Sequence, residues 1–270
     1  MSNIQGSLLD LGVMDQLARI DSPIHRLDPR AKIVAALALI VAAVSFERHQ
    51  ISALLPLLFF PVALGALGRI PAGVILRKLM LALPFVLFVG LFNPLFDRET
   101  MLRLGGIGIS GGWLSFLSIM LRSALTLGTA LVLLAVTGIP AIGAGLERLG
   151  TPRAFVVQLL FLYRYLFVLG EEALRMSRAR AQRSFDGRGT GLKSTASLLG
   201  NLMLRTLDRA ERIYTAMKSR GFNGEVRLRR TLRFTTTDLV FTAGWSGFFV
   251  AARLWNLPRL LGDLVAGVAR

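Results

Sequence analysis

The 270-residue sequence has no cysteine and only two histidines, His25 and His49. It can therefore form no disulfide bond and no zinc site built from Cys and His. A Ser-His-Asp catalytic set would have to use one of these two imidazoles, neither of which lies in a suitable constellation. No metal-ligand cluster is visible, and acidic residues are scarce, with 16 Asp and Glu against 32 Lys and Arg. We therefore expect no catalytic centre.

What the chain does have is apolar and basic character together. Hydrophobic residues make up 53% of it, the mean hydropathy is +0.58 and the formal net charge is +16. This combination is typical of a polytopic membrane protein whose charge lies on one side. The first 31 residues mix Asp with Arg, unlike a cleaved signal peptide, so we expect insertion through the first apolar helix.

Apolar runs predict an all-α membrane protein with about five transmembrane helices plus long amphipathic cytoplasmic helices. Pro56 and Pro61 are expected to kink the second helix. Ser22-Pro23 and Asp28-Pro29 are turn or helix-start signals in the polar entry, and Thr237-Asp238 is predicted to cap the last span. The predicted spans are 32–46, 51–68, 79–96, 113–139 and 239–255.

Loop charge gives an orientation. Arg69, Arg77 and Lys78 predict a cytoplasmic loop, whereas the charges in 97–103 cancel, as suits the outer side. The N-terminus is then cytoplasmic, and so is the segment 171–233. This segment has 15 Lys and Arg against 6 Asp and Glu, a net charge of +9.

The run 154–170 begins and ends on the cytoplasmic side in this orientation. Its apolar stripe continues into the polar segment, which indicates one long, shallow helix. The alternative is a sixth span with Arg164 inside the bundle. The stripe comprises Phe155, Leu159, Leu162, Leu166, Leu169, Ala173 and Met176.

A second amphipathic helix follows, and each of the two ends in an arginine beside a small residue. These ends are Arg183-Ser184 and Arg220-Gly221. The arginines could pair bidentately with carboxylates of a partner protein, or they could simply complement the negative end of each helix. A lipid-facing role for the basic segment is a further alternative. The second stripe comprises Leu199, Leu202, Thr206, Ala210, Ile213 and Met217.

The glycine-rich stretch 187–195 superficially resembles a phosphate-binding loop. That motif requires glycine immediately before the lysine, but Leu192 precedes Lys193 here, and no strand pattern comes before it. We interpret the stretch as a turn that separates two helices.

Three stretches are informative when taken together, namely SPIHRLDPRAK (22–32), the region 171–184, and RAERIY (209–214) through SRGF (219–222). In these stretches the sequence resembles the transmembrane T component of energy-coupling factor (ECF) transporters, and in particular the cobalt/nickel (CbiQ-type) subgroup. The resemblance covers nearly the whole chain. The family closes its two coupling helices with Ala-Arg-Gly-like triplets. Here these read Gln182-Arg183-Ser184 and Ser219-Arg220-Gly221, and Arg180 lies one turn before the first.

The resemblance implies a non-catalytic subunit with no metal or cofactor of its own. ATP and Mg would be bound by two ABC-type ATPase subunits (CbiO-like), and the transported cobalt or nickel by a substrate-binding membrane subunit (CbiM-like). A small auxiliary membrane subunit (CbiN-like) and membrane lipids complete the expected partners, with no nucleic acid. The implied ATPase-coupling residues are Arg183, Ser184, Ser219, Arg220 and Gly221, and further coupling candidates are Arg180, Gln182 and Arg164.

These expectations divide the chain into 1–139 (polar entry and four spans), 140–233 (coupling helices) and 234–270 (final span and tail). The expected location is the bacterial inner membrane. Two other functions stay open: a T component of a vitamin importer, and a basic membrane scaffold without ATPase partners. A channel or secondary transporter is disfavoured, because the predicted spans carry no acidic relay.

Overall fold

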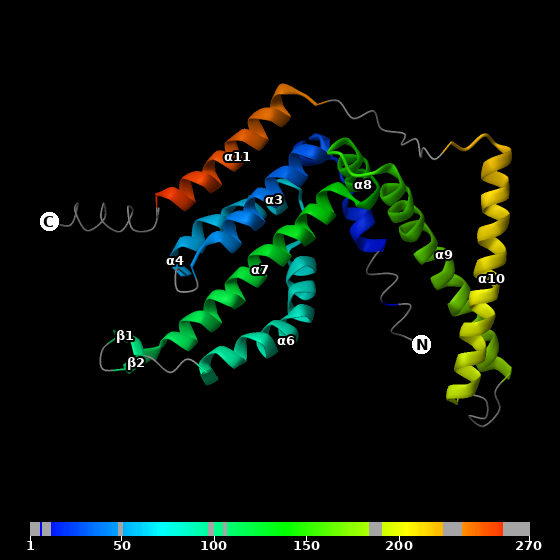
Figure 1. Ribbon diagram of the computed structural model, residues 1–270, viewed down its shortest axis with the longest axis horizontal. Coiled ribbons are helices and arrows are strands. Elements are labelled where there is room, and N and C mark those ends of the chain that lie inside the picture. Colours follow the sequence, from blue (N-terminus) through cyan, green and yellow to red (C-terminus); the bar gives the residue numbers. More distant parts are fainter. Residues whose placement is uncertain are drawn as a thin grey trace. The chain divides into compact units, whose positions relative to one another are not determined.

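The structure is a computed structural model that describes residues 6, 12–47, 51–96, 100–104, 107–183, 191–223 and 234–255 (Figure 1). The chain forms two compact units. The membrane unit comprises 17–138 and 232–270, and the coupling unit comprises 1–16 and 139–231. The three-part division expected from the sequence stays a prediction about domains.

In the membrane unit, α7 (Gly111–Thr137) is the central helix, since it packs against both α3 (Pro29–Ser45) and α6 (Ala72–Phe96). Helix α11 (Thr236–Leu254) packs on α3, so segments from the two ends of the chain are neighbours (Figure 1). The other elements are α2 (Pro23–Arg26), α4 (Ile51–Leu54), η1 (Leu55–Leu58), α5 (Phe59–Leu67), β1 (Thr100–Leu104) and β2 (Ile107–Ser110).

Phe60 forms the centre of an aromatic cluster that joins α5 to α11. Its side chain is fully buried, and its ring meets Trp245 edge-on at 4.9 Å and Phe249 at 5.4 Å between centroids. Edge-to-face pairs at such distances add directional attraction to simple packing. The cluster therefore ties the second apolar run to the last helix.

The predicted helix starts at the entry are confirmed. Ser22 and Asp28 are the N-caps of α2 and α3, with Pro23 and Pro29 as the first helical residues. The Asp28 carboxylate accepts the Arg30 backbone N–H at 2.9 Å. The cap of α11 is Thr235 rather than the predicted Thr237, and Asp238 accepts the Thr235 backbone N–H at 2.8 Å.

The second predicted helix is interrupted at one of its two prolines. A 3-10 turn, η1, surrounds Pro56 and separates α4 from α5. Pro61 is the third residue of α5, where a missing backbone N–H is tolerated. The α-helix is thus interrupted at Pro56, where a kink was predicted, whereas Pro61 lies within α5.

The all-α membrane fold is confirmed. In the part of the chain that the structure describes, three helices are long and apolar enough to cross a membrane, namely Ala72–Phe92, Gly111–Thr137 and Arg153–Arg183. Helix α3 and the interrupted run Ile51–Leu67 are shorter. Helix α6 begins at Ala72, seven residues before the predicted span, so Arg77 and Lys78 lie in a helix and not in a loop.

The strands β1 and β2 form an antiparallel hairpin that we did not predict. The sequence does carry a signal for it. In TMLRL-GG-IGIS, Leu102 and Leu104 alternate with Arg103 before a Gly-Gly pair, which is a recognised hairpin pattern. We missed this short motif because it lies between two long apolar helices.

Two arginines within the apolar region have structural roles at the end of α3. Arg122 donates to the carbonyl oxygens of Phe46 and Glu47, both at 2.8 Å. Arg253 donates to the Ser45 hydroxyl at 2.9 Å, and its guanidinium lies 5.1 Å from the centre of the Phe46 ring. Both side chains thus satisfy a helix C-terminus, which favours cations.

The coupling unit contains α8 (Ile139–Arg148), α9 (Arg153–Arg183) and α10 (Leu192–Ser219). The sequence analysis missed α8. It packs on α9 at Gly143, where an added Cβ would lie 3.4 Å from Val156 and Leu160 side-chain atoms. The two helices are therefore in contact at Gly143.

Candidate partner-binding site on the α9–α10 hairpin

Helix α9 runs without a break from the apolar stretch into the basic one. The prediction of one continuous helix is therefore confirmed. Its length and composition would also allow it to cross a membrane, so the shallow orientation stays a prediction. Arg164 is exposed on α9 within the coupling unit.

Helix α10 ends in a Schellman motif at the predicted Arg-Gly pair. The Gly221 N–H donates to the Lys218 carbonyl at 3.0 Å and the Phe222 N–H to that of Met217, also at 3.0 Å. Gly221 has φ +73°, a left-handed conformation that glycine adopts without a steric penalty. Arg220 is therefore held at the C-cap by the turn that stops the helix.

Two glycines, one inside α10 and one directly after its C-cap, should respond to alanine substitution with opposite changes in stability. Gly221→Ala should destabilise the helix end by about 1 kcal/mol, because alanine disfavours a positive φ. Gly200→Ala should stabilise α10 by about 0.5–1 kcal/mol, since Gly200 lies inside the helix with open space around its Cα. Thermal unfolding of the purified single variants in detergent would measure both. Equal shifts in the same direction would contradict this account.

Two polar contacts join the antiparallel helices. Arg205 Nη1 of α10 donates to Glu172 Oε1 of α9 at 3.0 Å, while Arg175 Nη2 donates to Glu172 Oε2 at 2.6 Å. Nearer the turn, Arg180 Nη1 donates to the Thr195 hydroxyl at 3.1 Å. Glu172 is the more sheltered partner, with its side chain 15% exposed. It therefore sets how the two helices are aligned.

A basic groove of about 750 Å³ opens beside these contacts. Four arginines line it against one carboxylate, so it attracts negatively charged groups. Serine hydroxyls and an asparagine amide add neutral hydrogen-bonding groups. Its lining residues are Glu172, Arg175, Met176, Ala179, Arg180, Arg183, Ser194, Ser197, Leu198, Asn201 and Arg205.

A second, more apolar groove of about 350 Å³ lies toward the other end of the hairpin. Its lining joins the first half of α9 to the second half of α10 and includes Phe222, next to the C-cap Arg220. The lining residues are Gln158, Phe161, Leu162, Tyr165, Leu169, Thr206, Arg209, Ala210, Ile213, Tyr214, Met217 and Phe222.

The predicted arginines thus occupy opposite ends of the hairpin. Arg183 lies beside the start of α10, where Ser194 and Ser197 share its groove. Arg220 follows the last residue of α10, so a rise of 1.5 Å per residue separates the two sites by roughly 40 Å. The structure therefore does not bring the two arginines together into one site.

The other predicted residues are placed as follows. Arg180 joins Arg183 in the basic groove, whereas Gln182 is exposed at the end of α9. Ser219 donates its hydroxyl hydrogen to the Thr215 carbonyl at 2.9 Å, which occupies it within α10. Ser184 lies outside the described residues. Among the residues described, no group of three His, Cys, Asp or Glu could hold a metal ion.

The sequence analysis missed Glu172, Arg175 and Arg205 as groove residues, and it assigned the α10 stripe only in part. Leu202, Thr206, Ile213 and Met217 are the half-buried members, but Leu199 is 59% exposed. Leu199, Met203 and Leu207 instead belong to a second, exposed apolar face of α10. Spacing within one helix could not distinguish which of two apolar faces meets the neighbour.

Comparison with known proteins adds independent evidence. A sequence profile of the CbiQ family, described as cobalt transport protein, matches residues 21–232. An energy-coupling factor transporter transmembrane protein EcfT from Heliobacterium modesticaldum is 31% identical over 90% of this chain and 97% of its own length. The EcfT of Thermanaerovibrio acidaminovorans is 30% identical over 95% and 100%, respectively.

A cobalt transport protein CbiQ from Rhodobacter capsulatus is 38% identical, over 33% of this chain and 36% of its own length. The profile covers well over half of the chain, and the match to the Heliobacterium protein is nearly end to end. Together with the apolar helices and the basic α9–α10 hairpin, these similarities show that the chain belongs to the CbiQ family, the transmembrane components of energy-coupling factor transporters.

Proposed function

We propose that this chain is the coupling subunit of an ATP-driven importer of cobalt or nickel ions. Membership of the CbiQ family is the observation that carries this proposal. In it, two CbiO-like ATPases bind and hydrolyse ATP, a CbiM-like membrane subunit captures the metal, and a small CbiN-like subunit assists. The chain resides in the bacterial inner membrane with its N-terminus in the cytoplasm.

The two arginine sites fit a pair of ATPase partners. Arg183 in its basic groove and Arg220 at its glycine-terminated cap lie at opposite ends of the hairpin, so each engages one ATPase. A guanidinium that enters an acidic groove pairs bidentately with a carboxylate. When ATP binding closes the ATPase pair, the two grooves move and α9 and α10 tilt. The exposed apolar face of α10 then acts on the metal-binding subunit.

A vitamin importer is the second candidate, and one observation favours it. The two relatives that match over 90% and 95% of this chain are named EcfT, without a substrate. The matches named CbiQ, from Rhodobacter capsulatus and Salmonella typhimurium, cover 33% and 55% of it. The family description supports the metal assignment over this alternative.

The test is reconstitution of the complete complex in liposomes. We expect ATP-dependent uptake of radioactive cobalt or nickel, no uptake by this chain alone, and copurification of two ATPase copies. Vitamin uptake without metal uptake would show that the substrate is a vitamin and not a metal ion. A chain that purifies without any ATPase would overturn the transporter role.

A further inference from the structure

The chain passes between the two units at three places, namely after Gln16, after Gly138 and after Thr231. On the membrane-unit side, one short stretch, residues 22–32, which we call the clamp segment, contacts residues beside the first two places and the first described residues after the third. These contacts come from different clamp residues and were not anticipated by the sequence analysis, which used this stretch for helix-start signals and for the family resemblance.

The first crossing is held by His25. Its Nε2 lies 3.1 Å from the carbonyl oxygen of Leu17, the last residue of the helical stretch described at 12–17. Because a carbonyl can only accept, Nε2 donates here. The Nδ1 atom lies 2.7 Å from the Ser22 hydroxyl, and the His25 side chain is buried, at 6% exposure. The ring is thus fixed from both sides.

The second crossing is held by Lys32. Its ammonium donates at 3.1 Å to the carbonyl of Val136, in the last turn of α7, and the residue is only 1% exposed. A lysine in the first turn of its own helix α3 opposes that helix dipole, whereas it complements the C-terminus of α7. Directly beyond, Gly138 takes φ +76° and its N–H donates to Leu134 at 2.9 Å, which ends α7.

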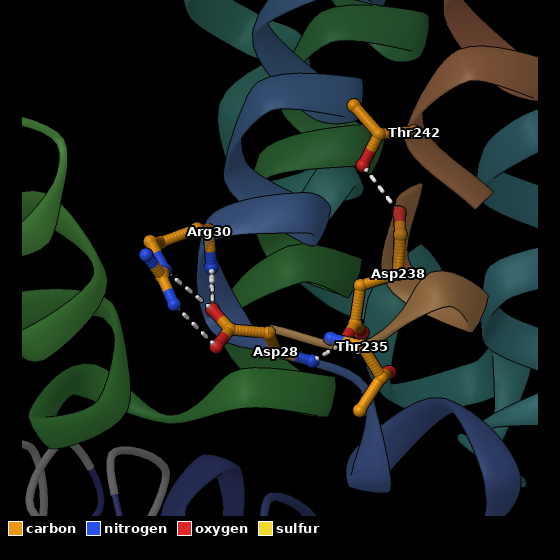
Figure 2. Close-up of polar contacts among 5 residues, drawn as sticks. All are labelled: Asp28, Arg30, Thr235, Asp238 and Thr242. Carbon is orange, nitrogen blue, oxygen red and sulfur yellow. Dashed lines mark hydrogen bonds and ion pairs between the residues drawn. The ribbon is translucent and has the colours of Figure 1, made fainter. Parts of the chain in front are cut away.

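After the third crossing, the first described residues of the membrane unit, from Phe234 to Asp238, are held by Asp28 and Arg30 (Figure 2). The Asp28 backbone N–H donates to Asp238 Oδ1 at 2.8 Å, and Asp238 also accepts the Thr235 hydroxyl hydrogen at 2.6 Å. The Arg30 guanidinium pairs with the Asp28 carboxylate at 3.1 Å and lies 5.3 Å from the centre of the Phe234 ring. The first turn of α11 is therefore bound to the start of α3.

We propose that the clamp segment joins the three crossings into one rigid base, so that movement of α9 and α10 reaches α7, α11 and the N-terminal helix together. Lys32 and Asp238 are positioning residues in this scheme, because they touch neither substrate nor ATPase. The expected effect on transport rests on the proposed coupling function, whereas the expected loosening of the crossings does not. Lys32→Met leaves the Val136 carbonyl without its ammonium donor. Asp238→Asn weakens the charge-assisted hydrogen bonds that the carboxylate accepts from Asp28 and Thr235, so each substitution should loosen a crossing.

The mechanical test uses spin labels on the full chain in lipid nanodiscs. The chain has no native cysteine, so Met203→Cys in the coupling unit and Val44→Cys in the membrane unit give unique labels at exposed positions. Pulsed electron resonance then measures their distance distribution. We expect Lys32→Met and Asp238→Asn to broaden it relative to the parent. Asp238→Asn keeps the side-chain shape and serves should Lys32→Met fail to fold.

Asp21→Asn is the matched control. Asp21 lies directly before the clamp segment and forms an exposed ion pair with Arg26, which holds no crossing. A hydrogen bond from Arg26 lowers the pKa of the Asp21 carboxyl. The control substitution should leave the distribution unchanged. Parental distributions in both clamp variants, or equal broadening in the control, would overturn the inference.

A second readout separates positioning from mere stability. In the reconstituted complex, the clamp variants should lower metal uptake per ATP hydrolysed while hydrolysis continues. A parallel loss of hydrolysis and uptake would show a purely structural role and overturn the positioning role. Because the spin-label experiment needs no partner and no substrate, it succeeds or fails independently of the proposed function.

Discussion

Replacing Arg183 and Arg220 together by alanine should abolish ATP-driven metal uptake while leaving the protein in the membrane. Each arginine is proposed to enter an acidic groove of an ATPase, and its removal leaves a partner carboxylate buried and unpaired, at a cost of about 3–5 kcal/mol. Such a cost lowers affinity by about two to four orders of magnitude at each site. Metal accumulation in cells and copurification of the ATPases would measure the two consequences.

Arg212→Ala is the control for this experiment. Arg212 is exposed on α10 and lines neither groove, so its loss removes a positive charge without removing a proposed contact. It should change uptake little, as expected for a surface charge. Normal metal accumulation in cells with the double variant would contradict the coupling role of the two arginines.

Phe60→Ala should be the most destabilising single substitution considered, at the lower end of about 3–5 kcal/mol. Phe60 is fully buried between Trp245 and Phe249, so truncation leaves a cavity and removes two edge-to-face contacts. The lower end applies because lipid, unlike water, does not penalise exposed apolar surface, which leaves mainly the packing loss. Denaturant unfolding in detergent, followed by tryptophan fluorescence, would measure it.

The neighbouring Phe59 provides an internal comparison. It has the same side chain, but 64% of its surface is exposed, and we expect Phe59→Ala to cost less than about 1 kcal/mol. If the two substitutions cost the same, burial in the aromatic cluster would not be what stabilises the α5–α11 contact.

The elements that could be predicted were those specified by local chemistry. Pro23 and Pro29 mark helix starts because proline fits the first helical position, and Gly221 marks a helix end because it tolerates the left-handed conformation. The long apolar runs likewise identified a membrane protein. The start of α6 was misplaced, because Arg77 and Lys78 suggested a loop, although long cationic side chains can extend from a helix toward water.

The candidate site was predictable at its ends but not along its length. Arg183 and Arg220 stand out because each lies at the end of a helix, and a helix end can be recognised from the local sequence alone. The ion pair between Glu172 and Arg205 depends on the register of two antiparallel helices. The pairs Arg180–Thr195 and Glu172–Arg205 do lie symmetrically about the connection 184–191, so assuming an antiparallel hairpin would have suggested them.

The sequence by itself determined the membrane class, the family and the positions of the terminal arginines, because hydropathy, capping and motif resemblance are local properties. Only the tertiary structure decided which distant groups the buried charged side chains contact. Lys32 is far in sequence from Val136, and Asp28 farther still from Asp238, yet each pair is within hydrogen-bond distance. A buried charge requires a partner, but local sequence does not reveal which distant helix end supplies it.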